Sequence, residues 1–398
     1  MPSFGDSMKR VWPFSFYFLY FAAFASLLPF FVLFYQGHGF SGAEIGLLTG
    51  VPPLITLFAT PFWTGLADAK RWHKWVMSLG ITMSVLVIFL LPSLTSFAAV
   101  FIAIILFNTF LSPVSSLTDS ATMTMLGEER AMYGRIRLGG TIGWGLFAPI
   151  AGAMAQNYGL KIVFWSFSAI MLINLFVSQR FVYSSHEKDT SNGGGIRILL
   201  TNRRWINFLF LAFLGGLGAF SAASYLYPYM AELGANESTM GIALTLSTLT
   251  EIPMFFFGDR LVKKFGSYGL LILALVLFGT RSLIFAAIST PLMVLIVQTF
   301  GGMIFPAMWT AGVSYADEHA PAGLKSTAQG LFGAVSFGFG SAISGFISGL
   351  LLESMGGRGM FLVLGIIIFA GIAIAEGIRH FFPEKEELPK VVAVASDK

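Results

Sequence analysis

Uncharged apolar runs of about 20 residues recur along the whole chain and constrain its fold more than any other feature. A helix needs about 20 apolar residues to cross the hydrocarbon core of a bilayer. Hydrophobic residues make up 56% of the chain and charged residues 11%, whereas a soluble domain carries about 25% charged residues. The core of a soluble protein cannot hold this much apolar side chain, so the sequence predicts an all-α membrane protein.

The apolar runs predict twelve transmembrane helices in two bundles of six. The first bundle is expected over 11–43, 45–67, 75–118 (two helices that break at 92–96), 138–160 and 162–179. The second is expected over 205–231, a run that ends near 258, 267–316 (two helices that break near 289–291), 326–352 and a run from 359. A polar, glycine-rich stretch between them is typical of a linker. The predicted units are therefore 1–183, a cytoplasmic linker over 184–204, 205–382 and a cytoplasmic tail over 383–398.

The distribution of Lys and Arg predicts the orientation. With both termini inside, 21 of the 24 basic residues fall on the cytoplasmic side, Lys161 and Arg358 fall outside, and Arg281 lies deep in the membrane. Cytoplasmic loops carry such an excess. We therefore expect a multi-pass protein of the plasma (inner) membrane with both termini in the cytoplasm. The net charge of +4 belongs to this solvated inner face and does not indicate a nucleic-acid partner.

The processing and redox signals are few. Lys9 and Arg10 precede the first apolar run, but the run is too long for a signal peptide and has no small-residue cleavage site, so we expect it to stay as a helix. The chain has no Cys, which excludes disulfides.

The two halves resemble each other in sequence. Asp68 and Asp259 each follow the second helix of their half and precede a basic loop. Phe107 and Pro113 match Phe300 and Pro306 at one constant offset. Parallel six-helix repeats of this kind place a substrate site near the membrane midplane, between the halves.

The loop over 63–75 (WTGLADAKRWHKW) resembles the loop between the second and third helices of the major facilitator superfamily, with Thr64 at the usual glycine position. The resemblance implies that Asp68, Arg71 and Asp259 form a cytoplasmic gate, in which the carboxylates pair with basic residues. An ordinary loop carboxylate among solvated charges is the alternative.

The stretch over 133–145 (YGRIRLGGTIGWG) is similar to the fifth helix of the lactose permease family, and 107–121 (FNTFLSPVSSLTDSA) looks closer to the phenylpropionate permease group. These resemblances imply substrate contacts at Asn108, Asp119, Arg137 and Trp144. A structural ion pair between Asp119 and Arg137, and packing or an interfacial position for Trp144, are the alternatives. An indole at 144 would stack on a sugar or an aromatic ring. Tyr227 is a further candidate for the substrate-binding set.

Glu251 and Arg281 correspond to charged residues of the coupling site in the lactose permease family. That family carries a His and a Glu shortly before the tenth-helix Pro, where this chain has Gly301 and Ile304 before Pro306. The coupling residues are therefore not all present, and neither proton symport by that route nor lactose follows from the resemblance.

The cost of buried charge supports the same residues independently. An ionisable side chain within the bilayer costs roughly 2.5–3.5 kcal/mol, so one without a function is rare. Counted along their helices, Asp119 and Glu251 each lie about 12 Å from the inner face, and Arg281 lies about 22 Å from it. Because desolvation favours the neutral form of a carboxyl group, Glu251 is the first candidate for a proton carrier. A permanently paired, structural Glu251 is the alternative.

These observations favour a secondary transporter that couples protons to a small solute by alternating access. A sugar, a nucleoside and an aromatic acid all fit the residues, and we favour the first two. A proton antiporter that exports apolar compounds, and a non-transporting membrane receptor or scaffold, are the alternatives. We expect no enzyme activity, cofactor or metal. The expected partners are the small-molecule substrate, protons and the lipid bilayer, and the resemblance implies a monomer.

Overall fold

The computed structural model describes residues 4–183, 199–321 and 324–381, so most of the expected linker and the tail from 382 lie outside it. These residues are helical, with turns and short connections between the helices and no strand among them. The first half contains α1 (Phe4–Leu27), η1 (Leu28–Phe30), α2 (Phe31–Gly37), α3 (Gly42–Lys70), α4 (His73–Leu90), η2 (Leu91–Ser93), α5 (Phe97–Leu126), η3 (Gly127–Met132), α6 (Tyr133–Tyr158) and α7 (Lys161–Ser178). The second half contains α9 (Arg203–Ser224), α10 (Leu226–Glu232), α11 (Glu237–Ala287), α12 (Pro291–Gly301), α13 (Ile304–His319), α14 (Lys325–Gly333), the π-helical η4 (Ala334–Gly340) and α15 (Ser341–Phe381).

The two longest helices are each composed of two segments. α11 turns at Gly266 and α15 at Gly356, where φ is 70° and 68°, a conformation that glycine adopts without steric cost. Within the described ranges, ten helices are long and apolar enough to cross a membrane. Dividing α11 and α15 at these glycines gives four membrane segments. If the short pieces of each broken helix, such as α12 and α13, are joined, the described helices form the two sets of six segments that the sequence predicts.

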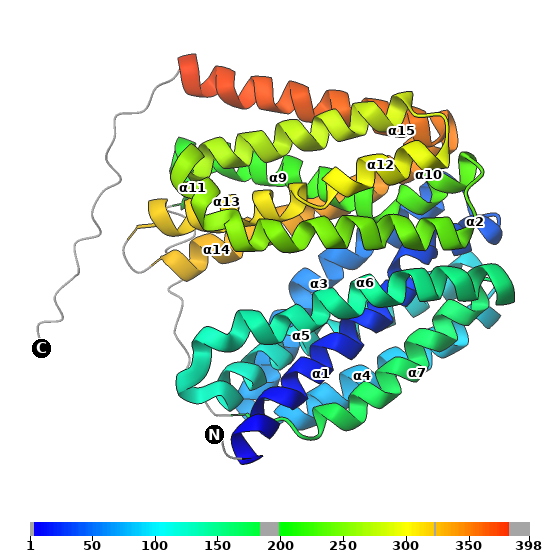
Figure 1. Ribbon diagram of the computed structural model, residues 1–398, viewed down its shortest axis with the longest axis vertical. Coiled ribbons are helices and arrows are strands. Elements are labelled where there is room, and N and C mark those ends of the chain that lie inside the picture. Colours follow the sequence, from blue (N-terminus) through cyan, green and yellow to red (C-terminus); the bar gives the residue numbers. More distant parts are fainter. Residues whose placement is uncertain (1–3, 184–198, 322–323, 382–398) are drawn as a thin grey trace, which may run out of the picture.

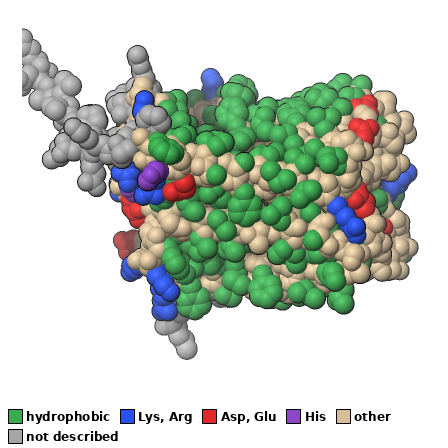
Figure 2. All heavy atoms as spheres, turned by 90° about the horizontal axis from the view of Figure 1, so that it is seen from above, with side chains coloured by type: hydrophobic (Ala, Val, Ile, Leu, Met, Phe, Trp, Pro, Cys, Tyr) green, Lys and Arg blue, Asp and Glu red, His purple; other side chains and the backbone are tan. Residues whose placement is uncertain are grey.

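The chain enters and leaves the bundle at the same end, here called the terminal end, which lies on the left of Figure 1. The other end is here called the opposite end. Hydrophobic side chains cover the middle of the face shown in Figure 2, and charged side chains gather toward its two ends. Exposed apolar residues such as Phe58, Phe176 and Leu292 belong to the outside of the helices, at 72%, 74% and 66% exposure. A lipid-facing belt accounts for this pattern.

Several helices extend beyond the apolar runs that predict them. α6 begins at Tyr133 rather than near 138, and the first segment of α11 continues to Gly266 rather than ending near 258. α9 begins at Arg203, inside the stretch expected as linker, where Leu199 is also fully buried. The prediction stops at the first charged residue, whereas a helix continues into the polar region, where charges such as Arg135 and Arg260 remain solvated.

The two halves meet along a seam of small residues near the opposite end. α3 packs on α15, and α6 packs on the first segment of α11. A methyl carbon added at Gly349 would lie 2.6 Å from the backbone nitrogen of Gly46, and one at Gly345 would lie 2.7 Å from that of Gly50. Small residues permit such backbone contact between membrane helices. The seam therefore closes the opposite end through main-chain contact.

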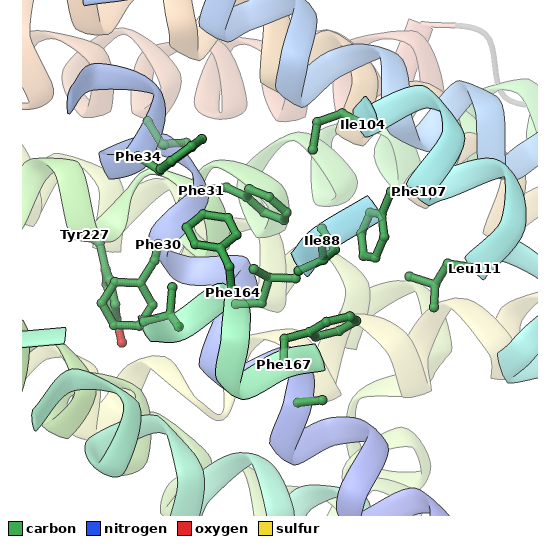
Figure 3. Packing of buried hydrophobic residues seen from close by; sticks show 14 of the residues in the cluster. Phe30, Phe31, Phe34, Ile88, Ile104, Phe107, Leu111, Phe164, Phe167 and Tyr227 are labelled. Carbon is green, nitrogen blue, oxygen red and sulfur yellow. The ribbon is translucent and has the colours of Figure 1, made fainter. Parts of the chain in front are cut away.

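Hydrogen bonds and aromatic rings complete this closure. The hydroxyl groups of Thr49 and Tyr225 lie 2.8 Å apart across the two halves, and Thr245 donates to the carbonyl of Gly145 at 2.9 Å. Phe30 meets Tyr227 edge to face, with 5.0 Å between ring centroids, beside the phenylalanine cluster of the first half (Figure 3). One apolar core accordingly runs through both halves at the opposite end.

The halves separate toward the terminal end, as Figure 1 shows. A methyl carbon added at Gly65 on α3, or at Gly330 or Gly333 on α14, would meet nothing within 4 Å. The ion pairs found among the described residues stay within one half, as in Arg10–Glu129 and Lys325–Asp317. The structure is therefore closed at the opposite end and open at the terminal end.

We expect Gly349→Val to open the opposite end and to close the terminal end. Its side chain would overlap the backbone of α3, and overpacking of this kind costs about 1–3 kcal/mol, which the halves relieve by separating at the seam. The terminal end then closes, and spin labels on Glu128→Cys and Lys264→Cys come closer together in pulsed electron paramagnetic resonance. Because the chain has no Cys, no background labelling occurs.

Gly330→Val is the matched control, since its side chain would enter open space. It should leave the distance between the labels unchanged. A Gly349→Val protein with the wild-type distance would contradict the role of the seam.

Candidate functional site

Four polar side chains meet in the first half. Tyr17, which is buried, donates a short hydrogen bond to Oδ1 of Asp119, and Tyr133 donates to the same oxygen at 3.0 Å. Arg137 donates to the Tyr133 hydroxyl at 2.8 Å, and its Nη1 lies 3.8 Å from Oδ2 of Asp119. We call these four residues the tyrosine–aspartate cluster. Its charged members remain partly exposed, at 35% for the Asp119 side chain and 48% for that of Arg137.

The position of Arg137 on α6 directs it toward the space between the halves. Gly139, Gly140 and Gly143 face α1, whereas Gly145 and Gly152 face α11. At about 100° per residue, Arg137 projects between these two faces. Trp144 follows seven residues later on the same side and is partly exposed. The charged group and the indole thus line one side of α6.

Asn108 has a local partner. Its amide donates to the carbonyl of Ile104, one turn earlier in α5, at 2.8 Å. The structure does not bring it into contact with the tyrosine–aspartate cluster.

Glu251 faces the same space from the second half. One face of α11 contacts α6 through Gly241, Thr245 and Thr248, the last of which lies against Gly145. Another face, which carries Ser247 and Thr250, packs on Gly302 just after α12. Glu251 projects between these two faces. It lies midway along its segment, fifteen residues from Gly266, or about 22 Å from the turn, because the helix is longer than predicted. No side chain that the structure describes forms a hydrogen bond or ion pair with it.

Arg281 is not paired with Glu251. Its Nη2 donates a short hydrogen bond to Oε1 of Gln298, and its guanidinium lies over the Phe285 ring, 5.2 Å from the centroid. Its Nε is buried and has no partner among the described residues. The structure thus brings Arg281 to a neutral amide rather than to a carboxylate.

Tyr227 belongs to the closure of the opposite end. It is 1% exposed, packs on Phe30, and its hydroxyl is buried without a partner in the described part of the chain. A solute would reach it only after the opposite end opens.

Among the described side chains, the expected gate residues Asp68 and Arg71 form no hydrogen bond or ion pair with the second half. Oδ1 of Asp68 lies 2.8 Å from Nε2 of His73 in the same half. Arg71 ends α3 in the left-handed conformation, with φ of 56°, and its side chain is exposed. Asp259 lies in α11, and its side chain is outside what the structure describes. A gate between the halves stays a prediction for the conformation in which the terminal end closes.

Three residues of the site escape the sequence-based search. Tyr133 lies four residues before Arg137, a spacing that places both on one face of a helix and signals their contact. Tyr17 and Gln298 lie in uncharged apolar runs, which a search for charged residues passes over.

Two bundles of membrane-crossing helices, joined closely at one end and parted at the other around buried polar groups, define a membrane transporter of the major facilitator superfamily. The family model described as "MFS_1 like family" matches residues 12–363, and the chain belongs to this family. Its family and its relatives are transporters rather than enzymes. The expected fold class and the resemblance to this superfamily are confirmed.

Relatives and solved structures agree with this assignment. The chain is 28% identical over 370 residues to "Maltose permease" of Geobacillus stearothermophilus, covering 92% of this chain and 93% of the relative. It is 22% identical over 362 residues to "Probable 3-phenylpropionic acid transporter" of Escherichia coli (strain K12), covering 88% and 93%. Two crystal structures of the nucleoside transporter NupG share its fold, with TM-scores of 0.83 and 0.79 at 18% identity. They cover 94% and 95% of this chain and 100% of the matched chains.

The tyrosine–aspartate cluster makes a prediction about stability. Asp119→Leu leaves the buried Tyr17 hydroxyl without an acceptor, which costs about 1–3 kcal/mol. We expect a lower midpoint of thermal unfolding in detergent. Adding Tyr17→Phe removes the stranded donor and should restore part of the loss.

Asn108→Ala serves as the control, because that amide only donates to its own helix. Equal destabilisation by Asp119→Leu with and without Tyr17→Phe would show that the two groups do not act together.

Proposed function

We propose that this protein is a proton-coupled symporter that takes up a small polyhydroxylated solute, in the first instance a sugar, by alternating access. One observation carries the proposal. Asp119 with Arg137 faces the space between the halves from the first half, and Glu251, which has no partner among the described side chains, faces it from the second. That space is open at one end of the molecule. A solute held between them contacts both moving parts, as alternating access requires.

The chemistry of the first half suits hydroxyl groups. The carboxylate of Asp119 accepts hydrogen bonds, and Arg137 donates them in a fixed planar geometry. Trp144 offers an apolar ring surface against which the face of a sugar would stack. The likeness to a maltose permease over most of both chains favours a sugar over the aromatic acid named for another relative. The shared fold with a nucleoside transporter makes nucleosides the next class to test.

Glu251 is the proposed proton carrier. Among the residues that the structure describes, no side chain forms an ion pair with Glu251. A carboxyl group among apolar helices favours the neutral form, since desolvation penalises the charged one. Protonation would let the second half close around the solute without a buried negative charge, and release would follow on the side of higher pH. Arg281 is the proposed second member of the coupling pair.

We propose that the terminal end is cytoplasmic. The topology predicted from the sequence assigns 21 of the 24 Lys and Arg residues to the side of the chain termini, which matches the excess found in cytoplasmic loops. The structure then corresponds to the inward-open state in the plasma membrane. The bundles over 1–183 and 205–382 would rock as two units about the solute, with 184–204 as their linker and a monomer as the working unit.

The first test is solute-induced proton uptake into proteoliposomes, over a panel of sugars, nucleosides and aromatic acids. We expect a sugar to carry protons inward with the wild type. Glu251→Gln should still bind the solute and abolish proton movement, because an amide does not exchange the proton. Glu237→Gln, at the start of the same helix, is the matched control and should behave as the wild type.

Each other outcome points to another function. Proton release on addition of an apolar compound to everted vesicles would support export by antiport. Solute flux that is the same in wild type and Glu251→Gln would remove the coupling role. Binding without any flux would favour a receptor or scaffold.

A further inference from the structure

Trp309 on α13 carries an exposed indole that the sequence-based search passes over. Its ring packs on Phe332 of α14, with 5.6 Å between ring centroids, and on Phe337 of η4, with 5.3 Å. Because Phe332 is fully buried, these contacts hold the indole in one orientation. The indole nevertheless remains 36% exposed. An aromatic side chain that is held in place and keeps a free surface is suited to bind a ligand.

The exposed surface of Trp309 faces the space between the halves. On one side of it α13 packs on α14, where a methyl carbon at Gly312 would meet the Phe332 ring, and on the other side Thr310 meets Gly258 of α11. At about 100° per residue, Trp309 projects between these two faces. α11 packs on α6 of the first half, and α15, which continues α14 and η4, packs on α3. The free side of the indole is therefore turned toward the first half.

Contacts between helices give the level of Trp309 along the bundle. Gly145 on α6 lies against Thr248 on α11, so these two residues share a level. Gly258 is ten residues nearer the terminal end on α11, or about 15 Å, and it lies against the residue that follows Trp309. Arg137 is eight residues nearer the terminal end on α6, or about 12 Å. The backbones of Trp309 and Arg137 are therefore within about 3 Å of one level, on opposite sides of the space.

The directions of the helices bring Trp309 and Trp144 closer in level than their backbones are. Side chains on a helix point back toward its N-terminus. α13 runs toward the terminal end (Figure 1), so Trp309 projects toward the opposite end. α6 begins at the terminal end, so Trp144, about 10 Å beyond Arg137, projects back toward the terminal end. The two indoles thus approach one level from opposite halves, and Arg137 lies on their terminal side.

This arrangement suits a solute that contains a ring. The face of a pyranose ring carries C–H groups, and its edge carries hydroxyl groups. The indole of Trp309 offers an apolar surface to such a face. Asp119 accepts hydrogen bonds from the hydroxyl groups at the edge, and Arg137 donates to them. An open-chain polyol has the same hydroxyl groups but no flat face, so Trp309 contributes little to its binding.

We propose that Trp309 is a specificity-determining residue, which stacks on a ring of the solute from the second half and selects cyclic sugars over open-chain polyols. This inference rests on the proposed uptake of a polyhydroxylated solute. It does not depend on the coupling of protons. A ring that contacts α6 on one side and Trp309 on the other touches both halves at the level where the terminal end must close.

The test measures solute binding to the purified full-length protein by isothermal titration calorimetry at one pH. The cyclic solutes are glucose, galactose and maltose, and the open-chain solutes are sorbitol and galactitol. We expect Trp309→Leu to raise the Kd of a cyclic sugar about tenfold, the size of one aromatic contact, and to leave the Kd of the open-chain polyols unchanged. Trp309→Phe keeps a ring and should raise the Kd of the sugar only about threefold.

Trp165→Leu is the matched control, because the Trp165 side chain on α7 is exposed to a similar extent, at 44%. It should bind every solute as the wild type does. A packing role for Trp309 would weaken the binding of sugars and open-chain polyols alike. That result, or a loss of the same size in Trp165→Leu, would overturn the specificity role.

The two proposals fail in different ways. If the wild type binds no sugar of the panel, the proposed function is wrong and the role of Trp309 falls with it. If the wild type binds a sugar and Trp309→Leu binds it equally well, the proposed function stands and only the role of Trp309 is lost.

Discussion

Backbone contact between α3 and α15 is the constraint on which the rest of the structure depends. Gly46 and Gly50 approach Gly345 and Gly349 so closely that a single methyl carbon would not fit between the helices. Within a membrane no hydrophobic force drives helices together, and close packing of small residues supplies the attraction instead. The contact is confined to one end of the molecule, so it closes that end while the terminal end stays open.

The polar groups follow from this geometry. The hydrogen bonds of the tyrosine–aspartate cluster lie within the first half, and the hydrogen bond between Arg281 and Gln298 lies within the second. Neither set needs the other half to hold its shape, so each can move as a unit. Glu251 is the exception, because no described side chain satisfies it. An unsatisfied carboxyl group between two self-sufficient halves is suited to a ligand or a proton that both halves share.

The sequence predicts the helices because apolar runs mark them, and it predicts the pairing of Asp119 with Arg137 because the family resemblance singles out both residues. It starts α6 about five residues too late and ends the first segment of α11 too early, because charged residues interrupt a hydropathy pattern without interrupting a helix. It misses Tyr17 and Gln298, whose partners lie on other helices at rotations that no local pattern specifies. The proximity of Gly301 to Arg281 likewise depends on tertiary packing. The sequence alone shows only that Gly301 stands where the lactose permease family has a histidine.

The most direct test of the account measures two distances between the halves of the protein in lipid vesicles, with and without solute at low pH. One pair of spin labels, on Glu128→Cys and Lys264→Cys, reports the terminal end, and another, on Lys161→Cys and Arg358→Cys, reports the opposite end. The account predicts a reciprocal change, in which one distance lengthens as the other shortens. Distances that rise and fall together, or that never change while solute crosses the membrane, would contradict alternating access about the glycine seam.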